Sequence, residues 1–127
     1  MANSPLAPHP LPPVATALDK IPVDKLKVPT GFKAELWSHG HPGGRTMVTG
    51  PKGTVFMGTR AIGRVYAIME KNGTRTAKIV IDKLVQPNGV LFHNGSLYVA
   101  AINQVLRFDN IEGNLDNIPP PVDMTEA

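Results

Sequence analysis

The chain has 127 residues, of which 42% are hydrophobic, which is enough for one small domain or for part of a larger one. It contains no cysteine, so disulfide frameworks and thiolate metal sites are excluded. The net charge of +3 comes from scattered lysines and arginines and aromatic residues are few, so we do not expect nucleic-acid binding.

Residues 1–30 are rich in proline. In the first part of this segment, prolines fall at almost every second position: Pro5, Pro8, Pro10, Pro12 and Pro13. Because proline fixes φ and lacks a backbone N–H, the segment predicts an extended tail or strap rather than a helix or a central strand. A ligand for a proline-recognising domain is the alternative.

Neither a secretory signal nor a membrane span is expected from the sequence. The first residues lack the basic region and the apolar region of a secretory signal. No stretch of the chain approaches the roughly 20 apolar residues that a membrane span requires.

From residue 31 onward, short apolar runs alternate with glycine-bearing turns. The runs rich in strand-forming residues lie at 32–37, 46–49, 54–58, 64–69 and 78–81. The turn at Asn72 and Gly73 separates two of these runs, and Asn-Gly in this position is a strong hairpin signal. No amphipathic helix is evident, so the sequence predicts an all-β protein.

The second half of this region repeats the first. Residues 53–57 (GTVFM) align with 95–99 (GSLYV), and residues 61–66 (AIGRVY) align with 101–106 (AINQVL). A repeat of about 40 residues with four short strands is typical of the blades of a β-propeller. A two-sheet sandwich is the structural alternative.

These patterns divide the chain into an N-terminal segment, 1–30, and a propeller region, 31–127. A first strand is expected at 32–37, where closed propellers often use such a strand to complete the last blade. Blade one is expected at 45–81, and an incomplete blade two at 88–127, with its fourth strand beginning near Val122. The predicted fold is thus a partial β-propeller of about two four-stranded blades.

Several linked motifs between residues 21 and 122 resemble one enzyme family. They include 30–37 (TGFKAELW), 55–60 (VFMGTR), 63–68 (GRVYAI), 87–92 (PNGVLF) and 107–112 (RFDNIE). Together they resemble the start of the sorbosone dehydrogenase branch of the soluble quinoprotein glucose/sorbosone dehydrogenases. Residues 1–20 take no part in the resemblance.

The resemblance implies a six-bladed propeller that holds pyrroloquinoline quinone (PQQ) over its axis with the help of calcium. It also implies a histidine base, a sugar or aldehyde substrate and a periplasmic location. The catalytic histidine and the calcium ligands of the family are expected beyond residue 127, so the chain alone is expected to be inactive. The alternatives are a non-enzymatic propeller binding module and, ranked lower, a fragment of a sugar-lactone hydrolase.

Propeller geometry places the polar residues of certain loops on the functional face. These residues are Arg45, Arg60, Gln86, Asn88 and Asn103. The arginines are candidates for binding the carboxylates of the quinone, because a guanidinium fork matches a carboxylate. Asn88 is a candidate for a hydrogen bond to a sugar hydroxyl or a quinone oxygen. The alternative is that both arginines are solvated and that Asn88 caps a turn.

Two further features suggest interactions. His39 and His41 lie on one side of an extended chain, as a metal site would require, but no third ligand is evident nearby and a surface loop is the preferred interpretation. A two-blade chain also leaves an exposed sheet edge, which favours self-association. Three such chains would supply the six blades of a closed ring.

Overall fold

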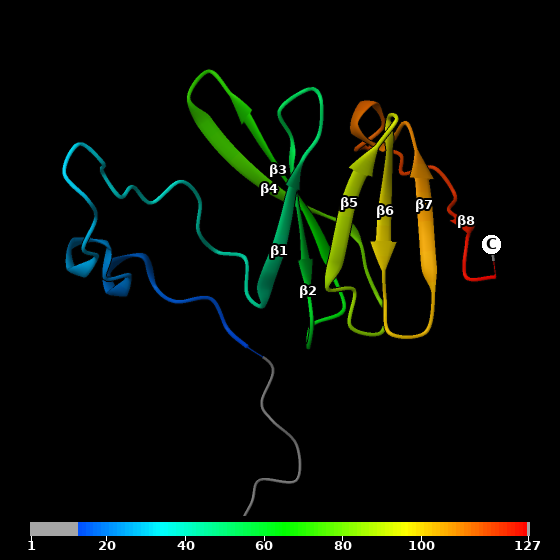
Figure 1. Ribbon diagram of the computed structural model, residues 1–127, viewed down its shortest axis with the longest axis horizontal. Coiled ribbons are helices and arrows are strands. Elements are labelled where there is room, and N and C mark those ends of the chain that lie inside the picture. The colour runs from blue at the N-terminus through cyan, green and yellow to red at the C-terminus, as the bar shows by residue number, and fades with distance from the viewer. Residues whose placement is uncertain (1–12, 127) are drawn as a thin grey trace, which may run out of the picture.

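The computed structural model describes residues 13–126, which form two antiparallel four-stranded sheets with little helix (Figure 1). The first sheet contains β1 (Gly44–Thr49), β2 (Val55–Thr59), β3 (Val65–Lys71) and β4 (Thr74–Ile81). The second contains β5 (Gly89–His93), β6 (Ser96–Ala100), β7 (Val105–Asp109) and β8 (Val122–Asp123). Within each sheet, strands that are consecutive in the chain are neighbours. The predicted all-β fold and both four-stranded units are confirmed.

The expected strand at residues 32–37 is wrong, because this segment belongs to neither sheet. Its alternating pattern is that of a strand, but a strand also needs a neighbouring strand to accept its backbone hydrogen bonds. No described residue provides that neighbour.

The prediction of an extended N-terminal segment also needs a correction. The segment contains two short 3₁₀ helices, η1 (Leu18–Lys20) and η2 (Val23–Lys25). The first has no proline within it, and Pro22 precedes the second at the position where the missing N–H of proline does no harm. The prolines at positions 5 to 12 lie outside the described residues.

Two Asn-Gly turns close hairpins at the same end of the sheets. Asn72 and Gly73 join β3 to β4, and Asn94 and Gly95 join β5 to β6. All four residues have φ between 46° and 80°, the pair of left-handed conformations that a two-residue hairpin turn requires. The predicted turn at residues 72–73 is therefore confirmed.

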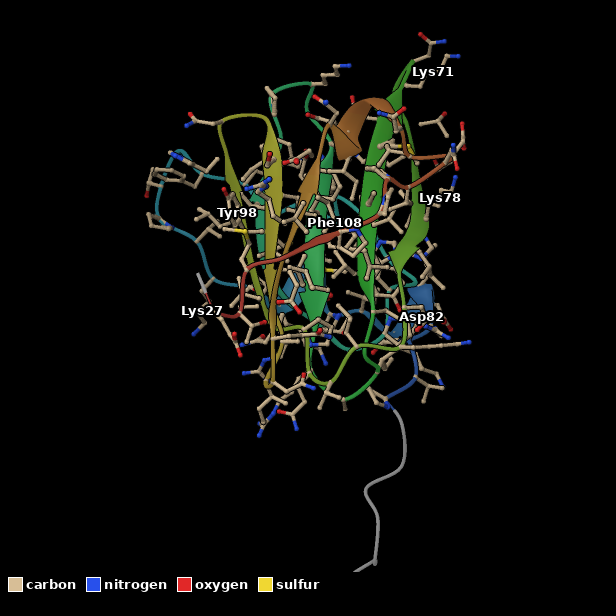
Figure 2. The ribbon with its side chains drawn as sticks, turned by 90° about the vertical axis from the view of Figure 1, so that its right-hand side faces the viewer. Lys27, Lys71, Lys78, Asp82, Tyr98 and Phe108 are labelled. Atoms are coloured by element: carbon tan, nitrogen blue, oxygen red, sulfur yellow. The ribbon has the colours of Figure 1, made fainter. Side chains whose placement is uncertain are left out.

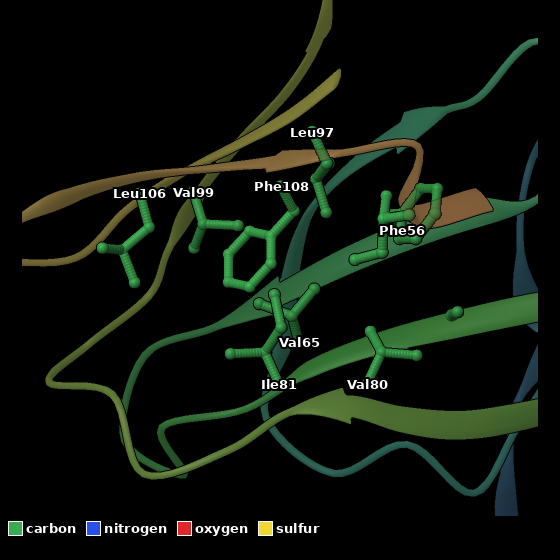
Figure 3. Close-up of a cluster of buried hydrophobic side chains, with 10 residues drawn as sticks. Phe56, Val65, Val80, Ile81, Leu97, Val99, Leu106 and Phe108 are labelled. Atoms are coloured by element: carbon green, nitrogen blue, oxygen red, sulfur yellow. The ribbon is translucent and has the colours of Figure 1, made fainter. Parts of the chain in front are cut away.

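The main hydrophobic core lies between the two sheets (Figure 3). The first sheet contributes Phe56, Val65, Ala67, Val80 and Ile81, and the second contributes Leu97, Val99, Leu106 and Phe108. Ile111, in the 3₁₀ helix η3 (Ile111–Gly113), is fully buried in the same cluster. Burial of apolar surface between the sheets is thus the main force that joins the two units.

The two sheets meet through faces that are not equivalent in the repeat. We call the side of the first sheet that carries Phe56 and Val65 its forward face, and the opposite side, with Met57 and Tyr66, its rear face. The residues aligned with Met57 and Tyr66 are Val99 and Leu106, and these pack against the forward face of the first sheet. Unlike faces therefore meet, as they do when each blade follows the last by rotation about an axis. A sandwich of two related sheets that buried the same face twice would place like faces together, so this packing is propeller-like.

A carboxylate joins the two units at the hairpin end. Glu112 follows β7, and its Oε1 accepts hydrogen bonds from the backbone N–H groups of Lys52 and Thr54, each at 3.0 Å. Both donors lie in the turn between β1 and β2. A Cβ on Gly50 would lie 2.6 Å from Glu112 Oε2, so the carboxylate fits only because residue 50 is glycine. Glu112 thus fixes the β1–β2 turn from the neighbouring sheet.

Replacing Glu112 with alanine should lower the free energy of unfolding by about 1–3 kcal/mol, because two backbone donors lose their acceptor. Glu112→Gln should lose less, since its amide oxygen still accepts. Chemical denaturation measures both changes, with Glu126→Ala, at an exposed position, as the control. Equal stability of Glu112→Ala and the control would contradict the structural role.

Candidate functional site

Three connecting segments meet at the end of the sheets opposite the hairpin turns. We call this the loop end; it consists of residues 60–64 between β2 and β3, 82–88 between β4 and β5, and 101–104 between β6 and β7. Figure 2 shows Lys71 at the hairpin end and Asp82 at the opposite end, where the β4–β5 linker begins. The loop end is where the sequence predicted the functional residues.

Backbone hydrogen bonds hold the β4–β5 linker between the other two segments. Leu84 donates its N–H to the carbonyl of Gly63 at 3.1 Å, and Ile102 donates to the carbonyl of Val85 at 2.9 Å. Gly63 has φ of 79°, and a Cβ there would lie 2.5 Å from the carbonyl oxygen of Leu84. The linker is therefore a fixed part of the site.

Gln86 adopts a left-handed backbone conformation, with φ of 49°. Such conformations are unfavourable for residues other than glycine and asparagine, and they gather at functional sites. The conformation is followed by a tight turn in which Asn88 donates its N–H to the carbonyl of Gln86 at 2.7 Å. This turn directs the chain into β5.

A β-bulge places Arg45 and Thr46 beside the linker. Gly44 pairs with Thr59 and Met47 with Met57, so Arg45 and Thr46 together oppose the single residue Gly58. Bulges re-aim side chains and are common beside active sites. Here the Thr46 hydroxyl donates a hydrogen bond to the backbone carbonyl of Asn88.

Gly58 allows the linker to approach the first sheet closely. A Cβ at this position would lie 2.5 Å from the carbonyl oxygen of Pro87 and 2.7 Å from that of Asn88. The bulge, the glycine and the Pro87–Asn88 turn therefore form one closely packed unit.

The structure brings Arg60 and Gln86 into contact at the loop end, whereas Asn103 lies apart from them. Arg60 donates from Nε to Gln86 Oε1 at 3.3 Å, and that bond leaves its Nη groups for a ligand. Asn88 Oδ1 is buried and has no hydrogen-bond partner among the described residues. Arg45 is exposed in the bulge of β1. Asn103 instead lines a separate hollow of about 400 Å³ with Asp123 and Thr125.

The loop end therefore exposes the guanidinium group of Arg60 and encloses one amide oxygen, Asn88 Oδ1, that has no described partner, while Arg45 is exposed in the adjoining bulge of β1. A buried polar atom without a partner is rare and favours a ligand or an ordered water. Thr46 was not predicted from the sequence, because its partner Asn88 is distant in the chain. The described residues contain no group of three or more histidine, aspartate, glutamate or cysteine side chains that could hold a metal ion.

A second group of polar and aromatic contacts lies on the rear face of the first sheet. Here residues 37–42, which we call the strap, lie against β3 and β4, on the side that faces away from the second sheet (Figure 1). The Arg75 guanidinium lies 4.7 Å from the ring centroid of Trp37 and donates to its carbonyl oxygen at 3.2 Å. The Tyr66 hydroxyl donates to the carbonyl of Pro42 at 3.3 Å.

His39 and His41 belong to the strap and line a pocket of about 440 Å³ with Trp37 and Arg75. His41 Nε2 and the Ser38 hydroxyl are 2.6 Å apart, and the His41 ring lies 5.9 Å from that of Tyr66. Burial, and to a lesser extent the charge of His39, lowers the pKa of His41. The neutral form of His41 therefore fits the docked strap better than the protonated form.

Substitution of Gly58 with alanine should destabilise the loop end, because the added Cβ would meet the backbone carbonyl oxygens of Pro87 and Asn88. These two residues are consecutive, so neither carbonyl can move without the other. We expect a loss of about 1–3 kcal/mol in the free energy of unfolding. Gly113→Ala is the matched control, since its Cβ would meet only the flexible end of Lys52 at 3.4 Å. Similar denaturation midpoints for both variants would contradict the close approach at Gly58.

Acidification should release the strap. Because the folded pKa of His41 lies below its ordinary value of 6.5, the folded chain binds fewer protons, and stability should fall as the pH drops through 6.5 toward the lowered value. Trp37 is the only tryptophan, so its fluorescence reports strap docking directly. His41→Gln should remove most of this pH dependence and His93→Gln, at the exposed end of β5, should not. An unchanged titration in His41→Gln would assign the effect to another group.

The described residues contain no helix long and apolar enough to cross a membrane. No protein family model, curated protein or solved structure matches this chain. The motifs and the geometry of the two sheets are therefore what indicate a function.

Proposed function

We propose that this chain forms the first two blades of a PQQ-dependent dehydrogenase that oxidises a sugar or an aldehyde. The observation that carries the proposal is the meeting of unlike sheet faces, which gathers Arg60, Gln86 and Asn88 at one end. The proposed enzyme has a six-bladed propeller, and this end would form part of the face over which the axis opens. The family resemblance of the linked motifs supplies the cofactor and the type of substrate.

The residues at the loop end suit parts of the quinone. PQQ carries carboxylates, and the guanidinium groups of Arg60 and Arg45 match their charge and shape. Asn88 belongs to the same linker as Gln86, the partner of Arg60, and its Oδ1 is buried with no described partner. When bound, the quinone would accept hydride equivalents from the substrate. Arg60 and Asn88 would hold and orient it, and Gln86 would fix the Arg60 side chain.

Acid–base catalysis is not assigned to the described residues. The family's histidine base and calcium ligands are expected in later blades, so we propose no proton transfer by the residues of this chain. We infer that the chain contributes binding groups and is inactive alone.

A non-enzymatic propeller module is the second candidate. It is favoured by the strap, which covers the middle of the rear face of the first sheet with residues of the same chain. Repeat proteins end in units that cover their own outer face in this way. In this case the loop end would bind a ligand without reducing or oxidising it.

Calorimetric titration with PQQ tests the cofactor assignment. Arg60→Gln should weaken binding about tenfold, the effect of one charge-assisted hydrogen bond worth about 1.4 kcal/mol. Asn88→Ala should also weaken it, whereas Lys71→Gln removes a charge at the hairpin end and should leave it unchanged.

Absence of PQQ binding to the folded chain, or equal binding by all three variants, would contradict the assignment. Dye reduction by sugars in the presence of PQQ then measures turnover, which neither candidate predicts for the chain alone. Turnover would contradict the expectation that the chain is inactive alone. PQQ binding that depends on Arg60 but gives no turnover is the expected result.

A further inference from the structure

The second sheet leaves its forward face open. The exposed fractions of Leu91, Val122 and Val105 on this face are 59%, 40% and 37%. Leu91, Tyr98, Arg107 and Val122 form one row across the four strands. Among the aligned residues of the first sheet, Phe56, Val65 and Ala67 are fully buried in the core between the sheets.

The first sheet has a rear face that its own strap covers only in part. Met47, Met57, Tyr66 and Ile79 form a row across this face. The two middle residues are buried, whereas the exposed fractions of Met47 and Ile79 are 63% and 43%. In the equivalent row of the second sheet, the two middle residues, Val99 and Leu106, are packed in the core between the sheets.

We propose that the rear face of the first sheet is a docking surface for the forward face of a second copy of this chain. The strap occupies this surface in the single chain. The choice of occupant rests on the interface that the molecule already contains, in which a forward face packs against a rear face. A second copy presents the same forward face, and docking it would continue that interface with the same hand and register.

The strap is held by few contacts and can be displaced. Its contacts with the sheet are the stacking of Trp37 under Arg75, one hydrogen bond from Arg75, one from Tyr66 and the contact of His41 with the Tyr66 ring. The forward face of a neighbouring sheet offers a broader apolar surface that includes Leu91 and Val122. Displacement exchanges a local polar contact for burial of apolar area.

The one charged group in the row of the forward face is already neutralised. Arg107 takes the place of Ala67 in the repeat, and its Nε and Nη2 donate to the Asp109 carboxylate at 2.9 and 3.2 Å. The Ser96 hydroxyl donates to the same carboxylate at 2.6 Å. A second copy can therefore cover this face without burying an unpaired charge.

Two complementary variants test the proposal. Trp37→Ala/Leu91→Glu has an open rear face and a charged forward face, whereas the wild-type chain has a covered rear face and an open forward face. Each should be monomeric alone in sedimentation velocity, and their mixture should form a dimer with one copy of each. Trp37→Ala alone, with both faces available, should form larger head-to-tail species.

The control mixture combines Trp37→Ala/Leu91→Glu with Leu91→Glu, which has no open forward face. A dimer in this mixture, or a monomeric mixture in the main experiment, would overturn the proposal. Circular dichroism checks that each variant is folded. Arg75→Gln replaces Trp37→Ala if the latter unfolds, because it also removes the stacking and the hydrogen bond to the strap. The experiment needs no PQQ, so its failure is distinct from failure of the cofactor assignment.

Discussion

The packing of the forward face of one sheet against the rear face of the next determines the rest of the structure. Phe56 and Val65 on one side and Leu97 and Val99 on the other are fully buried in one cluster. Since the faces are unlike, the second sheet is related to the first by a rotation. The hairpin turns of both sheets then lie at one end and the connecting loops at the other.

That arrangement explains why the polar residues of the loop end meet although they are distant in the chain. The β4–β5 linker must pass from the outer strand of one sheet to the inner strand of the next, and so it crosses the loop end. Gly58 and Gly63 allow it to pass close to the first sheet. The left-handed Gln86 then turns it into β5, which brings the Gln86 side chain to Arg60.

Local signals in the sequence predicted the elements whose conformation is decided locally. The Asn-Gly turn at residues 72–73 and the repeat that placed a last strand near Val122 are of this kind. The expected strand at 32–37 failed because pairing depends on a neighbouring strand that its own residues cannot reveal. Arg60 and Asn88 could be placed at one end from the repeat alone.

The contacts that complete the site could not be predicted, because they join distant segments through single side chains. In the sequence, Glu112 is one of several dispersed carboxylates. Only the packing of the second sheet brings it to the turn before Thr54. In the sequence, Thr46 is an ordinary strand residue. The bulge in β1 places its hydroxyl against the carbonyl of Asn88. Both depend on the register between units, which side-chain packing sets and a single sequence does not display.

The strap follows from the same asymmetry of faces. Two units related by rotation bury one forward face and one rear face, and they leave one of each at the outer sides. An uncovered apolar face is unfavourable in water, and here the strap covers the middle of the rear one. It does so with an indole, an imidazole and backbone carbonyls, whose contacts are specific but small in area. The expected strand at 32–37 shares only Trp37 with the strap, and it is the strap that covers the rear face, against which a further blade would pack.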